Sequence, residues 1–311
     1  MSPLAIAVVG PTGSGKSALA HDVAKVRDDV EIICVDSMTV YRGMDIGTSK
    51  PSLADQHEVR YHLVDLVDAG EEFSVAEFQR AARASRETIA QRGHHTIFVG
   101  GTGLYGRAVL DNLEIPAQYP EIRRQLEVEA VSNLADLYEE LQLNDPVAAQ
   151  RMESTNARRI IRALEVLRGS GRSFSSYGPG LSTYPPSAVI QIGLEVELEV
   201  LDRRIDERFL VWMEEGLLEE VRRLDQAQPA VSRTARQAVG YRELFGYLRG
   251  ESTLDQAVAA AQLATRRLAR RQLSWFRRDP RIEWFADTVG AQARVENLLH
   301  SNSHSWETGQ Q

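Results

Sequence analysis

The chain has 311 residues, of which 43% are hydrophobic and one is a cysteine. About two domains, or one domain with a large insertion, are expected at this length, and a core of this size needs no disulfide bonds for its stability. Cys34 alone excludes an internal disulfide. The N-terminus lacks the basic flank and long apolar core of a signal peptide, and apolar runs such as 4–9 are far shorter than the roughly 20 residues of a membrane helix. We expect a soluble cytoplasmic protein with no membrane partner.

Positive charge gathers in two segments of an otherwise acidic chain. The net charge is −8, yet residues 265–281 carry seven arginines and one acid, and residues 151–172 carry six arginines and two acids. These segments contribute +6 and +4, so the remainder carries −18. Such clusters predict either a localised anionic ligand or solvated helix faces whose arginines pair with nearby acids.

Strand and helix patterns alternate along the chain. Short apolar runs predict strands at 4–9, 31–35, 96–99, 189–196 and 282–285. Helical patterns cover 17–26, 74–92, 201–224 and 253–277. The second helix opens with a capping box of Ser74 and Glu77. This alternation predicts an α/β fold with a parallel sheet flanked by helices, and ligand chemistry at the carboxyl ends of the strands.

The strand signals stop between about Ile115 and Pro186. This part is helical in pattern, rich in arginine and glutamate, and ends in a Gly/Ser/Pro-rich stretch. It predicts a helical domain inserted into the α/β core. We therefore expect four segments, namely a first part of the core at 1–114, the insertion at 115–186, a second part with the arginine-rich helix at 187–300, and a polar, flexible tail at 301–311.

The first predicted strand runs into a glycine-rich turn that precedes a helix. The turn fits the P-loop pattern G-x-x-x-x-G-K-[ST], and its residues are Gly10, Pro11, Thr12, Gly13, Ser14, Gly15, Lys16 and Ser17. Backbone N–H groups of such a loop face phosphate oxygens, the lysine adds a charge, and the serine can hold Mg²⁺. The loop predicts binding of a di- or triphosphate and does not specify a nucleotide or its hydrolysis.

The carboxylate that orients Mg²⁺ in P-loop ATPases is absent from its usual place. The strand 96–99 is followed by Gly100-Gly101-Thr102 with no acid. The first acid at a strand end is Asp36, which lies near the P-loop if the first two strands are neighbours. Beside a phosphate site, Asp36 could be a metal ligand, a general base or a helix cap.

Several segments together resemble the tRNA dimethylallyltransferases, which isopentenylate adenosine 37 of tRNAs. The most distinctive is Asp36-Ser37-Met38-Thr39-Val40-Tyr41-Arg42-Gly43-Met44-Asp45-Ile46-Gly47-Thr48-Ser49-Lys50-Pro51. Further matches are 10–17, 100–105, 162–166, 239–242 and 265–277. The resemblance implies a monomer with a P-loop NTPase-like core, a parallel sheet flanked by helices and an inserted helical domain. It also implies tRNAs that read codons starting with U, and the lack of a Cys/His zinc finger after the core points to the bacterial form.

The resemblance also implies a reaction. The P-loop would hold the diphosphate of dimethylallyl diphosphate, and no phosphoryl group would be transferred. The exocyclic N6 of adenine is a poor nucleophile, so Asp36 would remove its proton, while Thr102 would touch the base or the leaving group. Lys16, Ser17 and Mg²⁺ would neutralise the departing diphosphate. Arg222 is a weaker candidate for a second diphosphate contact, with an exposed helix arginine as the alternative.

The partner implied is the anticodon stem-loop of tRNA, from which adenosine 37 must be extruded at a cost of a few kcal/mol. The implied tRNA contacts are Asp36, Ser37, Met38, Thr39, Thr102, Arg123, Arg158, Arg159, Arg162, Gln237, Gly240, Tyr241, Arg242, Arg270, Arg271, Gln272, Trp275 and Arg277. Trp275 is either an aromatic platform for loop bases or part of the core. Two positions depart from the family pattern. Thr39 replaces a common glutamine, which puts a base contact in doubt, and Thr155-Asn156 replaces a common Asn-Asp, which puts in doubt either a helix cap or a contact of the inserted domain.

Two other functions fit the P-loop. In a small-molecule kinase, Asp36 would deprotonate a hydroxyl group and the insertion would be a lid. The arginine-rich stretch 265–281 argues against this, since a metabolite kinase has no need of an extended surface for anions. In an NTPase that binds nucleic acid without chemistry on the base, an acid after strand 96–99 is expected, and none is present.

Overall fold

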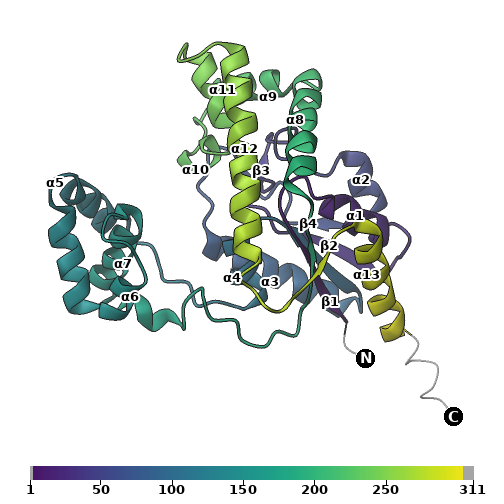
Figure 1. Ribbon diagram of the computed structural model, residues 1–311, viewed down its shortest axis with the longest axis horizontal. Helices are drawn as coiled ribbons and strands as arrows, with labels where there is room; N and C mark the ends of the chain where they lie inside the picture. Colours follow the sequence, from purple (N-terminus) through teal and green to yellow (C-terminus); the bar gives the residue numbers. More distant parts are fainter. Residues whose placement is uncertain (1–2, 304–311) are drawn as a thin grey trace. The chain divides into compact units, whose positions relative to one another are not determined.

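The computed structural model describes residues 3–303. Six strands form one sheet in the order β4-β2-β6-β1-β7-β8. They are β1 (Ala5–Val9), β2 (Val30–Cys34), β4 (Tyr61–His62), β6 (His95–Gly100), β7 (Ile190–Leu194) and β8 (Ile282–Phe285). Every neighbouring pair is parallel, which confirms the expected sheet (Figure 1). A second, two-stranded parallel sheet joins β3 (Tyr41–Arg42) and β5 (Val67–Asp68).

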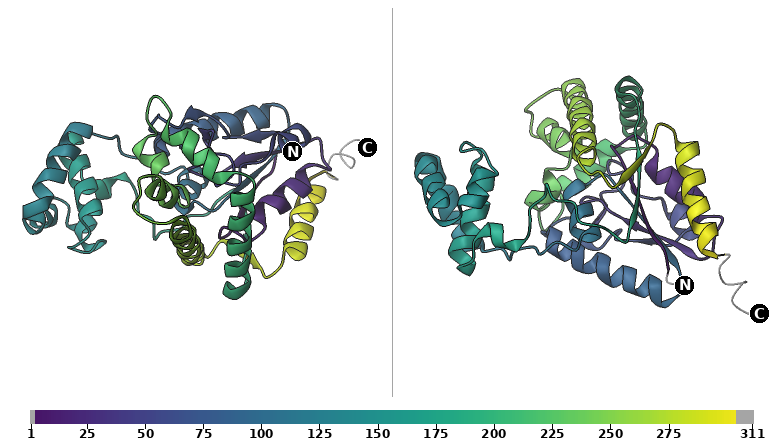
Figure 2. Two further views of the ribbon diagram at one scale, coloured as in Figure 1. Left: turned by 90° about the horizontal axis from the view of Figure 1, so that it is seen from above. Right: turned by 60° about the horizontal axis from the view of Figure 1, so that its bottom comes forward.

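Helices cover both faces of the main sheet because its strands alternate in the direction of their side chains. Ile6 and Val8 lie in one apolar cluster with the helices α1 (Lys16–Ala24) and α13 (Thr288–Ser303). These two helices lie side by side along the sheet (Figure 2). Ala5, Ala7 and Val9 lie in the other cluster, with Phe78 of helix α3 (Val75–Gln91).

The second half of the chain contributes most of the other helices around the main sheet. These other helices are α2 (Leu53–Glu58), α4 (Gly103–Leu110), α8 (Leu198–Glu214), α9 (Leu217–Asp225), α10 (Arg233–Arg236), α11 (Tyr241–Leu248) and α12 (Leu254–Phe276). The long helix α12 packs against α8 and α11 (Figure 1). The single helix expected over 201–224 is wrong, because Gly216 adopts a left-handed φ of 100° and separates α8 from α9.

The chain divides into two compact units, and the second comprises Asn112–Pro185. It contains the helices α5 (Pro120–Asn144), α6 (Pro146–Gln150) and α7 (Ala157–Ser170) and a 3₁₀ turn at Phe174–Tyr177. Its own apolar core includes Leu126, Leu141, Ile160 and Leu164. The unit therefore has the helical character expected of residues 115–186.

Two expectations concern the ends of the chain and its solubility. Of the expected tail 301–311, residues 301–303 end helix α13, and 304–311 lie outside the described residues. Within residues 3–303, no helix combines the length and the apolar character needed to cross a membrane.

Candidate active site

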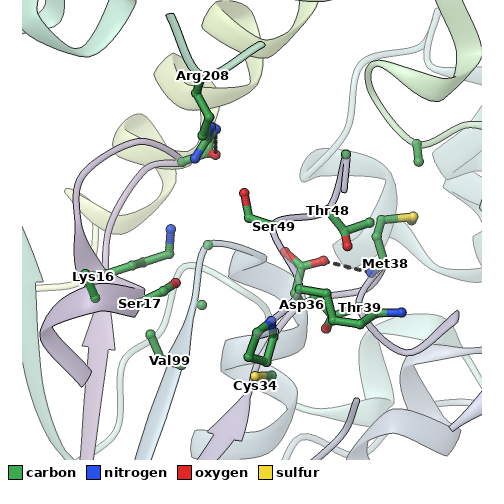
Figure 3. Close-up of a pocket in the computed structure, with 18 of the residues that line it drawn as sticks. Lys16, Ser17, Cys34, Asp36, Met38, Thr39, Thr48, Ser49, Val99 and Arg208 are labelled. Atoms are coloured by element: carbon green, nitrogen blue, oxygen red, sulfur yellow. Dashed lines mark hydrogen bonds between the residues drawn. The ribbon is translucent and has the colours of Figure 1, made fainter. Parts of the chain in front are cut away.

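A pocket of about 450 Å³ opens at the carboxyl ends of the strands β1, β2 and β6. The P-loop, the segment after β2, the loop 47–51 and helices α8, α11 and α12 contribute its lining. In Figure 3, Lys16 and Ser17 lie across the pocket from Asp36, and Arg208 closes one side. This is the edge of the sheet at which α/β folds place ligands.

The P-loop begins directly after β1. Gly15 has a left-handed φ of 92°, which favours glycine, and it forms the N-cap of α1. The first N–H groups of α1 therefore point at the pocket with the positive end of the helix dipole. This is an arrangement that binds phosphate groups.

Lys16 is held inside the loop. Its ammonium Nζ donates to the carbonyl oxygen of Pro11 at 3.2 Å. Desolvation in the pocket and the positive charge of Arg208 lower the pKa of Lys16 to about 8, although Asp36 acts in the opposite direction. Binding of an anion beside Lys16 would stabilise its protonated form.

Arg208 is the functional side chain that sequence reasoning missed. It lies on α8, and its guanidinium donates to the hydroxyl oxygen of Thr12 at 2.8 Å and stacks over Trp212 at 4.7 Å. Its buried Nε has no partner among residues 3–303, and desolvation lowers the pKa of Arg208 to about 10. A positive group with an unused buried donor fits an anionic ligand. The available signal was helical spacing, because Arg208 follows the buried Leu201 and Ile205 along one face of α8.

For Arg222 the structure favours the alternative of an exposed helix arginine, and the diphosphate contact stays a prediction. Helix α9 buries Leu217, Val221 and Leu224 and turns Arg222 towards solvent. There Arg222 pairs with Glu219, and it does not belong to the pocket lining as described. The second cation beside the P-loop is Arg208.

Asp36 follows β2 and faces the P-loop across the pocket (Figure 3). Its Oδ1 accepts a hydrogen bond from Met38 N at 2.8 Å, which closes a turn. No helix starts at this point of the described chain, so the helix-cap alternative is wrong. Desolvation raises the pKa of Asp36, against the opposing effects of the Met38 N–H and of Lys16. A raised pKa makes the carboxylate a stronger base.

The predicted site residues around Asp36 differ in whether they reach the pocket. Met38 and Thr39 line the pocket, and the buried Thr39 hydroxyl has no partner within residues 3–303. Ser37 does not belong to the described lining. Thr102, the N-cap of α4, makes no side-chain capping bond and also lies outside the described lining, which instead includes Gly100 and Gly101.

Gln272 and Trp275 of α12 are turned towards the protein. The Gln272 amide oxygen accepts from Thr12 N at 2.8 Å, so Gln272 contacts the P-loop. The Trp275 indole packs so closely on Gly103 that an added Cβ there would lie 2.2 Å from the ring. Arg278 stacks on the same ring at 4.9 Å. Trp275 is therefore partly a core residue.

The arginines of α12 and the segment after it fall into two groups. Most are paired with acids, and the pairs are Arg266 with Asp206, Arg270 with Asp202, Arg277 with Glu195, and Arg281 with Asp279 and Asp111. Arg267 and Arg271 are exposed one helical turn apart, with no carboxylate partner in the described part of the chain. Of the expected tRNA contacts here, Arg271 is the one with its charge available.

The expected tRNA contacts in segment 237–242 also differ in their structural roles and exposure. Gln237 caps α10, and Gly240, with a φ of 93°, is the N-cap of α11. Tyr241 is fully buried, and its hydroxyl binds Glu220. Arg242 is exposed and pairs with Glu243.

In the second unit, the buried carboxylate of Glu165 organises the arginines. It accepts from Tyr119 N at 2.8 Å and pairs with Arg162 and Arg123 at 2.9 and 3.4 Å. Arg158 and Arg159 remain exposed at the start of α7. The cap placed in doubt by the sequence is present, because Asn156 Oδ1 accepts from Arg159 N at 3.2 Å.

Comparisons with known proteins agree with one another. A family profile described as IPP transferase matches residues 39–279. A tRNA dimethylallyltransferase of Paenarthrobacter aurescens is 48% identical over 280 residues, covering 90% of this chain and 89% of the relative. Another, of Streptomyces avermitilis, is 44% identical over 298 residues, covering 96% and 94%.

Solved structures are similar over almost the whole chain. The full-length tRNA isopentenylpyrophosphate transferase of Bacillus halodurans is 36% identical, with a TM-score of 0.68 and coverage of 97% and 96%. A eukaryotic dimethylallyltransferase acting on tRNA has a TM-score of 0.77, with coverage of 98% and 80%. At 24% identity, the latter supports the fold alone. The core is thus of the P-loop NTPase-like type.

Proposed function

The chain belongs to the IPP transferase family, and we propose that it transfers a dimethylallyl group from dimethylallyl diphosphate to N6 of adenosine 37 in tRNAs that read codons starting with U. The relatives are named as prenyltransferases of tRNA. One observation carries the chemistry, namely that Asp36 faces a phosphate cradle with no acid at the end of β6. A Cβ at Gly100 would lie 2.0 Å from the Val35 carbonyl oxygen, so that strand end has no room for an ATPase carboxylate.

The diphosphate is bound by Lys16, Arg208 and the N–H groups at the start of α1. The lowered pKa of Lys16 and the unused donor of Arg208 support this placement. The donor set also fits Mg²⁺, because the Ser17 hydroxyl faces the pocket and Mg²⁺ commonly takes its other ligands from phosphates and water. When bound, Mg²⁺ would neutralise charge on the diphosphate.

Asp36 is the general base. As the N6 lone pair attacks the allylic carbon, the C–N bond forms and the bond from that carbon to the diphosphate oxygen breaks. The N6 proton passes to the Asp36 carboxylate, and diphosphate leaves with the bonding electron pair. The hydrogen bond from Met38 N to Asp36 Oδ1 orients the carboxylate for this step.

Exposed arginines bind the tRNA backbone. Arg271 on α12 and Arg158 and Arg159 on α7 have the charge available for phosphates. Arg123 and Arg162 instead support the fold of the second unit through Glu165.

The test is label transfer from radioactive dimethylallyl diphosphate to unmodified tRNA with Mg²⁺, followed by nucleoside analysis. We expect label on adenosine without consumption of ATP. Asp36→Asn is expected to keep tRNA binding and to lower turnover by about 10². Wild-type turnover in this variant would remove Asp36 from its role.

An ATP-consumption assay with the same protein separates the competing function. Consumption of ATP with no labelled nucleoside would replace the prenyl transfer by a kinase reaction, in which Asp36 deprotonates a hydroxyl group.

A further inference from the structure

The loop from Asp45 to Pro51 forms one wall of the pocket. Residues 47–51 belong to the lining, and Thr48 and Ser49 lie beside Asp36 and across from Lys16 (Figure 3). Ser49 has a φ of 52°, a left-handed conformation that is unfavourable for a residue other than glycine. The loop's own hydrogen bonds, from Ser49 N to Ile46 O at 3.0 Å and from Lys50 N to Asp45 O at 3.1 Å, support this shape, and contacts from outside the loop add to them.

Those contacts come from two buried side chains of α9 and α11. Glu220 is 1% exposed, and its Oε2 accepts from Asp45 N and Ile46 N at 3.1 and 3.0 Å. Its other carboxylate oxygen accepts from the Tyr241 hydroxyl, which itself accepts from Gly47 N at 3.1 Å. Three consecutive N–H groups of the loop are thus bound by one carboxylate and one phenol.

Close packing of the loop against Tyr241 accompanies these hydrogen bonds. A Cβ at Gly47 would lie 2.6 Å from the Tyr241 ring and 3.0 Å from Leu217, so the loop backbone rests directly on the ring. At the other end, the buried ammonium of Lys50 binds Asp45, Asp65 at 2.6 Å and the Tyr41 carbonyl oxygen at 2.8 Å. The loop is fixed on both sides of Ser49.

The hydrogen bonds in this network cannot be replaced by water. Glu220 is buried, so each donor that it loses leaves an unsatisfied carboxylate oxygen. Burial and the neighbouring Glu220 raise the pKa of Tyr241, so its hydroxyl keeps the proton that it donates. Tyr241 belongs to the pocket lining beneath the loop, yet Tyr241 and Glu220 are each at most 1% exposed.

We propose that Glu220 and Tyr241 are positioning residues for the prenyl transfer, which hold residues 45–47 and thereby set the wall 45–51 against which the acceptor base lies beside Asp36. They act through the loop and make no contact with tRNA. This differs from the direct tRNA contact implied for Tyr241 by the family resemblance. The proposal rests on the proposed function and adds a role for the segment 237–242.

The experiment compares Tyr241→Phe and Glu220→Gln, singly and together, in the full-length protein. Hydrogen exchange of the ligand-free protein is followed by mass spectrometry in peptides that cover 44–50, and steady-state kinetics are measured for both substrates. We expect faster exchange in these peptides and a KM for tRNA raised about tenfold. The KM for dimethylallyl diphosphate is expected to stay within about twofold, because the P-loop is not part of the network.

The pair is expected to behave as a unit, so the double variant should be little worse than either single variant. Tyr247→Phe, a half-buried tyrosine on the same helix outside the pocket lining, is the matched control and should change neither readout. Weaker tRNA binding with unchanged exchange in Tyr241→Phe would overturn the proposal in favour of direct contact. Additive effects would overturn it too. If the wild-type protein labelled no tRNA, the proposed function would fall, and the exchange data would still test the loop contact.

Discussion

Lys16 and Arg208 place two cations in a pocket where Asp36 lies across from the P-loop, and the described lining also includes the carboxylates of Asp22 and Asp55. Each cation makes one hydrogen bond to the P-loop, Lys16 to a carbonyl oxygen and Arg208 to a hydroxyl group, and Arg208 Nε has no partner within residues 3–303. Desolvation lowers the pKa of both groups. The pocket therefore stores unfavourable electrostatic free energy that a diphosphate relieves on binding.

This environment predicts proton uptake on binding. The pKa of Lys16 is about 8 in the free protein, so an increasing fraction is neutral above that pH, and an anionic ligand must restore the proton. The affinity for dimethylallyl diphosphate should fall as pH rises above 8, approaching about tenfold per pH unit. Calorimetry in two buffers of different ionisation enthalpy measures the uptake. Lys16→Met should bind more weakly and lose this dependence, and an equal slope in both proteins would contradict the prediction.

At the scale of elements, patterns of burial are what the sequence shows best. The apolar runs predict the longer strands within a few residues, since every residue of β1 and β2 is buried, and the helical patterns predict α1, α3 and α12. The pattern over 201–224 merges α8 and α9, because the break at Gly216 is a backbone feature that burial does not show. The strands β3, β4 and β5 have two residues each, and only their tertiary neighbours define them. The same holds for the site, where motifs predicted Lys16 and Asp36, whereas Arg208 depends on how α8 crosses the P-loop.

Helix α12 shows that the number of arginines in a segment does not by itself tell which of them can bind phosphates. Arg270 and Arg271 are adjacent in sequence, yet Arg270 makes a bidentate pair with Asp202 and Arg271 is exposed without such a partner in the described chain. An arginine held by an acid releases fewer counterions on binding a phosphate than a free one.

We therefore expect the two arginines to differ. Arg271→Ala should lower the slope of log K against log salt for tRNA by about 0.7 to 0.9, the values for one phosphate contact in a single strand and in a duplex. Arg270→Ala is the matched neighbour and should change the slope less. Fluorescence anisotropy of labelled tRNA over a salt series measures both. Equal changes in slope would show that the pair with Asp202 does not withhold Arg270 from the RNA.

Across the whole molecule, the two ends of the sheet serve different purposes. The carboxyl ends of the strands carry the pocket, while the start of β2 carries the buried carboxylate of Glu31. This carboxylate accepts two hydrogen bonds from Arg92 at 2.8 and 2.7 Å, and His62 and His94 lie within 2.7 and 2.8 Å. It thereby joins β2 to the short edge strand β4 and to the turn between α3 and β6.

This cluster predicts how the fold responds to acid. Although desolvation acts against it, hydrogen bonds from Arg92 and His62 lower the pKa of Glu31 to about 2, below the value of 4.5 for a free glutamate. A depressed pKa contributes stability that is complete above pH 4.5 and is lost as pH falls towards 2. Glu31→Gln should lower the free energy of unfolding by about 3 kcal/mol at pH 7, as for a broken buried pair.

Urea unfolding at a series of pH values measures the effect. The difference between wild type and Glu31→Gln should not fall between pH 7 and about 5 and should shrink below that, because protonation of the carboxylate removes its advantage. Glu283→Gln, which breaks the half-exposed pair with Arg294, is the matched control and should cost less than about 1 kcal/mol. A difference that stays constant down to pH 3 would mean that the shape of the Glu31 side chain, and not its charge, holds β4 to the sheet.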